Sequence, residues 1–334
     1  MRSEKCPSTF CIVILNLSYH ILAAYVLDLT IGDPHKFPHP VRAMGWMIVR
    51  SERLLRRSVP NLRVAGVLLV VWMVLFAGAG TWGLLWLAGR WHPAWSVVLS
   101  IGLLWTGFAT KSLYRESAHV LRALRQDDVG LARRKLSMIV GRDTEHLDEP
   151  EIVRAALETI GENLCDGVIA PLVYAAIGGA PLLMAYKAVS TLDSMVGHRN
   201  ERYEKFGWAS ARMDDCVNFV PARLTGVLIC GTAFLLRLDG RRAWHIFRRD
   251  RLKHRSPNSA HGESAMAGAL GVQLGGQSTY AGEPSLTPLL GDPINALHAG
   301  PIASAHRLLF VTSALGMMIL LGFRLAIRLV IDDW

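Results

Sequence analysis

The chain has 334 residues, of which 51% are hydrophobic and only 19% are charged. Soluble domains carry about 25% charged residues, so this composition argues against an ordinary soluble protein. The net charge of +9 lies mainly beside apolar runs, as in the cytoplasmic loops of membrane proteins, and we expect no nucleic-acid partner. The five cysteines form no C-x-x-C pair, which excludes the usual zinc spacing and gives no disulfide framework.

The first half of the chain contains three apolar runs. We interpret residues 10–27 as an uncleaved first helix, because no clear cleavage site of a signal peptide follows them. Residues 64–89 are 26 residues without a charge, whereas about 20 suffice to cross a bilayer core. Residues 93–110 form a second run, joined to the first by three residues, which predicts a tight antiparallel hairpin. The flanking segments are basic and are therefore predicted to be cytoplasmic.

Polar and apolar segments alternate through the rest of the chain. Residues 111–163 are hydrophilic with helical spacing, and Asp148 followed by Pro150 predicts a helix start there. The apolar run 164–189 is interrupted at 178–181 by Gly-Gly-Ala-Pro, which predicts a re-entrant segment or a packed helix pair. Residues 217–238 could span or lie along the interface, 237–305 form a long polar region, and 308–331 form a last anchor.

The fold predicted from these runs is all-α. We expect a polytopic integral membrane protein with about four or five transmembrane helices, forming one membrane-embedded domain over 1–334. The expected location is the cytoplasmic membrane, with the lipid bilayer as a partner and the active site facing the cytoplasm.

Three carboxylates come before the interrupted apolar run. Glu158, Glu162 and Asp166 are spaced by four, so a helix places them on one face, where like charges repel. Ionised groups are also costly beside an apolar segment, and a divalent cation would compensate both effects. Oxygen ligands favour magnesium. The alternative is a solvated helix end that forms salt bridges with nearby arginines.

Two further stretches carry charge beside apolar runs. Lys187 ends an apolar run, Asp193 precedes a glycine-containing turn, and Arg199 and Arg202 offer forked donors for phosphate or carboxylate oxygens. An ordinary basic loop on lipid headgroups is the alternative. Arg223 lies inside an apolar run, with Asp214 or Asp215 as its expected partner, unless its side chain snorkels to the interface.

Two loops complete the candidates. The proline-rich segment 28–41 holds Asp33 and His39, which could bind a metal or simply stiffen a loop at the membrane edge. The glycine-rich segment 256–276, with Asn258 near its start, lets the backbone approach a ligand but contains no P-loop.

Taken in order, these stretches resemble the CobD/CbiB family of adenosylcobinamide-phosphate synthases. The resemblance covers about residue 20 to the C-terminus and is carried by four motifs: LDLTIGDPHKFPHPVRAMG at 27–45, ETIGENLCDGVIAPLVYAAIGGAP at 158–181, YKAVSTLDSMVGHRNERYEKFGWASARMDDCVNFVPARLT at 186–225, and SPNSAHGESAMAGALGVQLGG at 256–276. It implies a role in cobalamin biosynthesis. The implied enzyme is a ligase that uses ATP to join adenosylcobyric acid to (R)-1-amino-2-propanol phosphate, or to free aminopropanol, as an amide.

The implied reaction suggests roles for the candidate residues, and this division of roles is our hypothesis. Mg²⁺ and ATP would be required, and the corrinoid would be a substrate rather than a cofactor. The magnesium ligands would be Glu158, Glu162, Asp166 and Asp193. The catalytic candidates are Lys187, Asp214 and Asp215. The substrate- and phosphate-binding candidates are Asp33, His39, Asn163, Arg199, Asn200, Arg202, Asn218, Arg223 and Asn258.

Two other classes of function remain open at the level of the sequence. The broken apolar segment and Arg223 would suit a transporter, although no internal repeat is visible. A non-catalytic scaffold that holds other membrane-associated corrinoid enzymes is the second alternative. Changes at the acidic motifs would leave the output of the pathway intact if the chain were such a scaffold.

Overall fold

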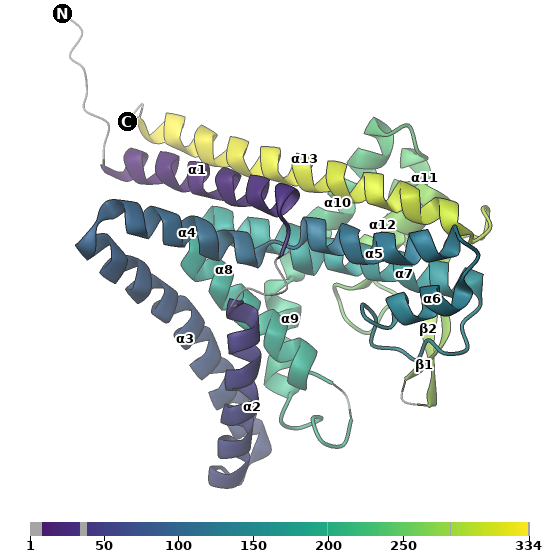
Figure 1. Cartoon of the computed structure of the whole chain (residues 1–334), viewed down its shortest axis with the longest axis horizontal. Coiled ribbons are helices and arrows are strands. Elements are labelled where there is room, and N and C mark those ends of the chain that lie inside the picture. Colours follow the sequence, from purple (N-terminus) through teal and green to yellow (C-terminus); the bar gives the residue numbers. More distant parts are fainter. Residues whose placement is uncertain (1–8, 34–38, 199, 281, 333–334) are drawn as a thin grey trace, which may run out of the picture. The chain divides into compact units, whose positions relative to one another are not determined.

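The computed structural model describes residues 9–33, 39–198, 200–280 and 282–332, and the chain forms two compact units. Unit 1 comprises Met1–Phe108, Pro171–Cys216 and Gly316–Trp334, and unit 2 comprises Ala109–Ala170 and Val217–Leu315. Each unit is therefore assembled from segments far apart in the sequence (Figure 1). The single domain predicted over 1–334 stays a prediction.

Helices are the only regular secondary structure of unit 1 within the described residues. Its helices are α1 (Thr9–Thr30), α2 (Pro40–Ser58), α3 (Leu62–Trp91), α4 (Pro93–Gly107), nearly all of α8 (Ala170–Val196), nearly all of α9 (Trp208–Val217) and the C-terminal part of α13 (Ala299–Asp332). Helix α3 packs against α2 and α4, and α4 packs against α1. His92 ends α3 and caps α4, because its Nδ1 accepts a hydrogen bond from the Ala94 amide (3.2 Å). This geometry confirms the predicted tight hairpin.

Helix α8 contains the predicted break. Gly178 and Gly179 leave the helical conformation, and Gly179 adopts a φ of +63°, which a side chain would strain. Pro181 follows at once and removes one helical donor. The Gly-Gly-Ala-Pro signal therefore marks a real interruption.

Unit 2 contains shorter helices and a hairpin. Its elements are α5 (Thr110–Leu124), α6 (Val129–Leu136), α7 (Glu149–Leu164), the π-helical turn η1 (Cys165–Ile169), α10 (Phe219–Leu235), α11 (Gly240–Asp250), α12 (Ala260–Leu270), β1 (Gln273–Tyr280), β2 (Glu283–Gly291) and the N-terminal part of α13. Helix α7 starts as predicted, with a capping box in which Asp148 and Glu151 each accept from the other's backbone amide.

The centre of unit 2 is α12, all of whose residues are buried. It packs against α7, α10 and α11, and the antiparallel hairpin β1–β2 follows it. We predicted only a long polar region over 237–305, so α11, α12 and the hairpin are corrections to that prediction. A short Gly- and Ala-rich helix buried on every side has no amphipathic period, which is why its sequence resembles a loop.

Four helical stretches of the described chain are long and apolar enough to cross a membrane: Leu62–Trp91, Pro93–Leu124, Glu149–Val196 and Ala299–Ile327. Helices α9 and α10 would form a fifth if they are counted together. The protein is therefore a helical, polytopic membrane protein, as predicted. The anchors expected at 64–89, 93–110 and 308–331 overlap these stretches, whereas the one at 10–27 lies in α1, outside the four.

Candidate functional site

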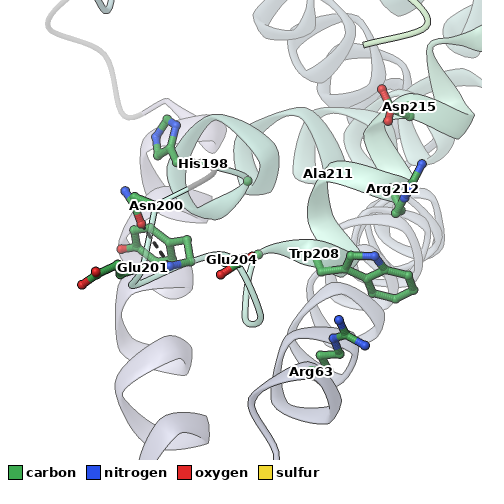
Figure 2. A pocket seen from close by; sticks show the side chains of 12 residues that line it. Arg63, His198, Asn200, Glu201, Glu204, Trp208, Ala211, Arg212 and Asp215 are labelled. Atoms are coloured by element: carbon green, nitrogen blue, oxygen red, sulfur yellow. Dashed lines mark hydrogen bonds between the residues drawn. The ribbon is translucent and has the colours of Figure 1, made fainter. Parts of the chain in front are cut away.

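A cavity of about 610 Å³ lies in unit 1, next to the start of α9 (Figure 2). We call it the α9 pocket. It is lined by Arg63 at the start of α3, by residues of the segment between α8 and α9, and by α9 itself. The full lining is Arg63, Gly197, His198, Asn200, Glu201, Tyr203, Glu204, Gly207, Trp208, Ala211, Arg212 and Asp215.

Charges of both signs line the α9 pocket, and they are distributed unevenly. Figure 2 shows Trp208, Arg63 and Arg212 together on one side, and Asn200 and Glu201 on the other. The Arg63 guanidinium lies 6.0 Å from the centre of the Trp208 ring, within cation–π range. Guanidinium groups bind phosphate and carboxylate oxygens, and carboxylates bind ammonium groups, so the pocket can hold a small molecule with both charges.

The wall of the α9 pocket is held in place by a buried carboxylate, Glu52 of α2, which is only 5% exposed. It accepts from Arg56 Nε (2.9 Å), from Arg202 Nη2 (3.2 Å) and from the Tyr203 hydroxyl (3.5 Å). Arg56 also donates to the Arg202 carbonyl (2.9 Å) and lies 4.2 Å from the Phe206 ring centre. Glu52 therefore ties α2 to the segment that lines the pocket.

Close backbone contact strengthens this attachment. A Cβ atom on Gly66 of α3 would lie 2.0 Å from the Phe206 carbonyl oxygen, so only glycine fits there. The segment after α8 thus rests directly on α3, which carries Arg63 at its first turn.

Several predicted residues meet at the α9 pocket. Asn200 and Asp215 line it, and Asp193 lies within electrostatic reach of Asp215 and His198. Asp214 is the neighbour of Asp215 on α9. The Arg202 side chain is directed to Glu52, and Arg199 lies outside the described residues.

Of the residues that line the α9 pocket, sequence reasoning named only Asn200 and Asp215 as site residues. Among those it missed are Arg63, Trp208 and Arg212, and it also missed Glu52 behind the pocket wall. Arg63 and Glu52 lie more than 130 positions before the segment they contact, and no local pattern links them to it. One signal was present, because Glu52 is the single acidic residue among seven basic ones over 36–63. A lone acid in a basic helix indicates an internal ion pair.

A second group in unit 1 brings together Asp33, His39 and Lys187. His39 caps α2 by accepting from the Val41 amide, and its Nε2 lies 3.4 Å from an Asp33 oxygen. Burial lowers the pKa of His39, Asp33 opposes this effect, and Arg42 and Lys187 add to it. Burial and the two cations thus favour the neutral imidazole of His39, and Asp33 favours the charged one.

The third group lies in unit 2, where α7 crosses α12. Glu158 is buried, lies 2.6 Å from Arg142 Nη2, and accepts from the Gly275 amide of β1 (2.7 Å). The helices approach closely because Gly262 leaves room for the Gly161 carbonyl, which would lie 2.2 Å from a Cβ at Gly262.

This crossing places Glu263 of α12 near two acids of α7. Full burial raises the pKa of Glu263 well above its ordinary value, Glu162 and Glu158 raise it further, and Arg142 opposes the shift. The raised pKa favours the protonated form of Glu263, so its burial beside Glu158 and the exposed Glu162 adds less negative charge to the cluster.

The described residues contain no group of three or more His, Cys, Asp or Glu side chains arranged to hold a metal ion. Glu158 already has Arg142 and the Gly275 amide as partners, so its geometry does not fit a ligand role. Asp166 lies in η1, and Asp193 belongs to unit 1. The magnesium set of Glu158, Glu162, Asp166 and Asp193 stays a prediction.

The other predicted residues lie in unit 2, outside the lining of the α9 pocket. The Asn163 amide donates to the Thr159 carbonyl of its own helix (3.0 Å), and Asn218 and Asn258 are buried. Arg223 donates to the Phe219 carbonyl (2.6 Å) and lies 3.4 Å from the Phe219 ring centre. Its observed partner is thus Phe219 of the same helix.

The spans and the charged groups beside them define a helical membrane protein with a polar pocket built from its juxtamembrane segments. The profile of the family described as CobD/Cbib protein matches residues 21–309. The chain is 51% identical over 313 residues to cobalamin biosynthesis protein CobD of Geobacter metallireducens, covering 94% of this chain and 98% of the relative. It is 45% identical over 304 residues to cobalamin biosynthesis protein CbiB of Salmonella typhi, covering 90% and 95%.

The chain therefore belongs to the CobD/Cbib family. A third relative, CobD of Clostridium perfringens, is 43% identical over 93% of this chain and 99% of its own length. No solved structure matches the chain.

Proposed function

We propose that the chain acts in cobalamin biosynthesis as an amide-forming ligase. It would use ATP to join a propionate carboxyl of adenosylcobyric acid to the amine of (R)-1-amino-2-propanol phosphate, or of free aminopropanol. Family membership supports the pathway, and the observation that carries the reaction is the α9 pocket, whose mixed charges suit a small amine that bears a phosphate. The expected place is the cytoplasmic membrane, with the pocket facing the cytoplasm.

The chemistry determines what the site must supply. A carboxylate cannot expel oxide when an amine attacks it, so its oxygen first attacks the γ-phosphorus of ATP, forming an acyl phosphate and releasing ADP. The amine then attacks the acyl carbon, the C–O bond to phosphate breaks, and phosphate leaves with one former carboxylate oxygen. Magnesium accompanies the ATP phosphates in such reactions and would neutralise part of their charge.

The α9 pocket would have to recognise both ends of the amine substrate, its phosphate and its ammonium group. Arg63 and Arg212 would bind its phosphate. Asp215, or its neighbour Asp214, would accept a proton from the ammonium group, because only the free amine attacks carbon. Arg199 remains a candidate for the same phosphate, whereas Arg202 serves chiefly to fix the pocket wall through Glu52.

Lys187 would act on the other substrate. It lies in the group with Asp33 and His39, and its ammonium could neutralise charge on a transferring phosphoryl group. Asn163, Asn218, Arg223 and Asn258 stay candidates for contacts to the corrinoid or to ATP. Other membrane-associated corrinoid enzymes would be the partners that receive the product.

The test is turnover by the full chain purified in detergent. With adenosylcobyric acid, aminopropanol phosphate and Mg-ATP, mass spectrometry should detect adenosylcobinamide phosphate. Asp215→Asn should reduce turnover at least 100-fold, the usual size of a general-base effect, and Arg212→Gln should mainly raise KM. Arg57→Gln, an exposed arginine outside the pocket, is the matched control. ATP-independent corrinoid flux into proteoliposomes without any product would favour a transporter instead.

A further inference from the structure

The outer face of α11 in unit 2, together with the residue before the helix, carries three exposed arginines. Arg241 and Arg248 are exposed and lie on the same face of α11, two turns apart, and Arg237 is exposed just before the helix. Within the part of the chain that the structure describes, none of these three side chains has a hydrogen-bond or ion-pair partner. We call Arg237, Arg241, Trp244, Arg248 and Leu252 the basic face.

The cations on the flanks of the same helix, by contrast, have acidic partners within the protein. Arg242 lies 3.2 Å from Asp239, Arg249 lies 2.8 Å from Asp250, and Lys253 lies 2.7 Å from Asp250. Three flanking cations are thus neutralised inside the protein, whereas the arginines of the basic face have no acidic partner among the residues that the structure describes. This contrast points to an anionic partner outside the chain.

Apolar side chains between these cations indicate what that partner is. Trp244 is 43% exposed and Leu252 is 59% exposed. The basic face also follows the end of the apolar helix α10, where Phe234 and Leu235 are 56% and 64% exposed. A passage from exposed apolar residues to tryptophan interspersed with arginine is the pattern of a membrane–water interface.

The inner face of α11 is already occupied. Ala243, Ile246 and Phe247 are buried, and α11 packs against α10 and α12 (Figure 1). A Cβ on Gly268 of α12 would lie 2.7 Å from the Ala243 Cα, so the two helices are in backbone contact. The helix is thus fixed to unit 2 by one face and presents the other as a rigid surface.

We propose that the basic face binds the headgroups of anionic phospholipids. Arg237, Arg241 and Arg248 would contact the lipid phosphates, while Trp244 and Leu252 would lie at the level of the upper acyl chains. This site is separate from the α9 pocket and does not depend on the reaction proposed for it.

The test uses the full chain in detergent, with native mass spectrometry of bound lipid. The protein should retain phosphatidylglycerol in preference to phosphatidylcholine with the same acyl chains, and salt should weaken this binding. Arg241→Gln with Arg248→Gln should lower the phosphatidylglycerol affinity about 30-fold, since each cation near an anionic surface contributes about a factor of five. Glycerol phosphate should not compete, because it has no acyl chains.

The matched control is Arg122→Gln with Arg125→Gln, which removes two exposed cations elsewhere in unit 2. It should retain the lipid as the unmodified chain does, and the melting temperatures of both variants should agree within a few degrees. Equal phosphatidylglycerol affinity in the two double variants, or no preference over phosphatidylcholine, would overturn the proposal. Either result would leave an acidic protein as the partner of the basic face.

Discussion

Glu52→Gln is the perturbation whose consequence follows most directly from the structure. The side chain keeps its size but loses the charge that Arg56 and Arg202 share. Removing one partner from a buried ion pair costs about 3–5 kcal/mol. Here water recovers part of that cost, because Arg56 is 23% exposed and Arg202 is 67% exposed. We expect a net cost of about 2 kcal/mol for the loss of the ion pair. This cost would shift the equilibrium between the attached and the detached state of segment 200–207 about 30-fold towards the detached state.

The loss should be visible without any substrate. Amide hydrogen exchange over residues 200–207 should accelerate in Glu52→Gln, since this segment lines the α9 pocket and is tied to α2 through Glu52. In turnover, KM for the amine substrate should rise while kcat changes little, because Glu52 positions the pocket rather than the reacting atoms. Glu52→Asp keeps the charge, so its hydrogen exchange and KM should lie between those of the unmodified chain and Glu52→Gln.

Arg53→Gln, an exposed position on the same helix, is the control and should change neither measurement. Unaltered exchange over 200–207 in Glu52→Gln would refute the structural reasoning. Accelerated exchange with an unaltered KM would instead show that the α9 pocket does not bind the amine.

Three further changes test other parts of the structure. Gly66→Ala should destabilise unit 1 by about 2 kcal/mol, measured as a lower melting temperature in detergent, because its Cβ would meet the Phe206 carbonyl; an unchanged temperature would contradict that packing. The raised pKa of Glu263 means that the folded state holds its proton where the unfolded state, with a pKa near 4.5, has lost it. Its contribution to stability is therefore complete below pH 4.5 and lost as pH rises through the folded pKa. Glu263→Gln should accordingly raise the melting temperature at pH 8 and not at pH 4, and equal shifts at both pH values would be inconsistent with a raised pKa of Glu263. Asp250 is buried and, despite that burial, its partners Arg249, Lys253 and the Gly291 amide hold its pKa at about 2; Asp250→Asn should lower stability at pH 7 and lose that effect below about pH 2, and a pH-independent effect would argue against an ionised Asp250.

The parts of the fold that were predictable are those whose signal is local in the chain. Two uncharged runs, 64–89 and 93–110, identified the first two membrane-spanning helices, and the Gly-Gly-Ala-Pro sequence identified the break in α8. Asp148 with Pro150 likewise marked the start of α7, because a capping box involves only neighbouring residues.

The parts that could not be predicted depend on contacts between distant segments. Helical spacing correctly placed Glu158 and Glu162 on one stretch of helix, but it could not show that Arg142 and the Gly275 amide take up the Glu158 carboxylate. Salt bridging to an arginine was the alternative considered for this motif, although the observed pair is buried rather than solvated.

The hairpin β1–β2 was missed for a related reason. Its first strand has two glycines with positive φ, Gly275 and Gly276, and its register shifts between Leu274 and Gly276. Such a strand lacks the regular alternation of apolar and polar residues from which strands are recognised. Arg154 of α7 holds it by donating to the Gly275 and Gln277 carbonyls (2.9 and 2.7 Å).

One isotope experiment tests the proposed ligase reaction most directly. Adenosylcobyric acid labelled with heavy oxygen in its free propionate carboxylate would be incubated with the purified chain, aminopropanol phosphate and Mg-ATP. The account predicts that each amide formed is accompanied by one inorganic phosphate carrying one labelled oxygen, because that oxygen leaves the acyl carbon with the phosphate. Recovery of the corrinoid with both labelled oxygens still in place, while ATP is consumed or the corrinoid crosses the membrane, would contradict it.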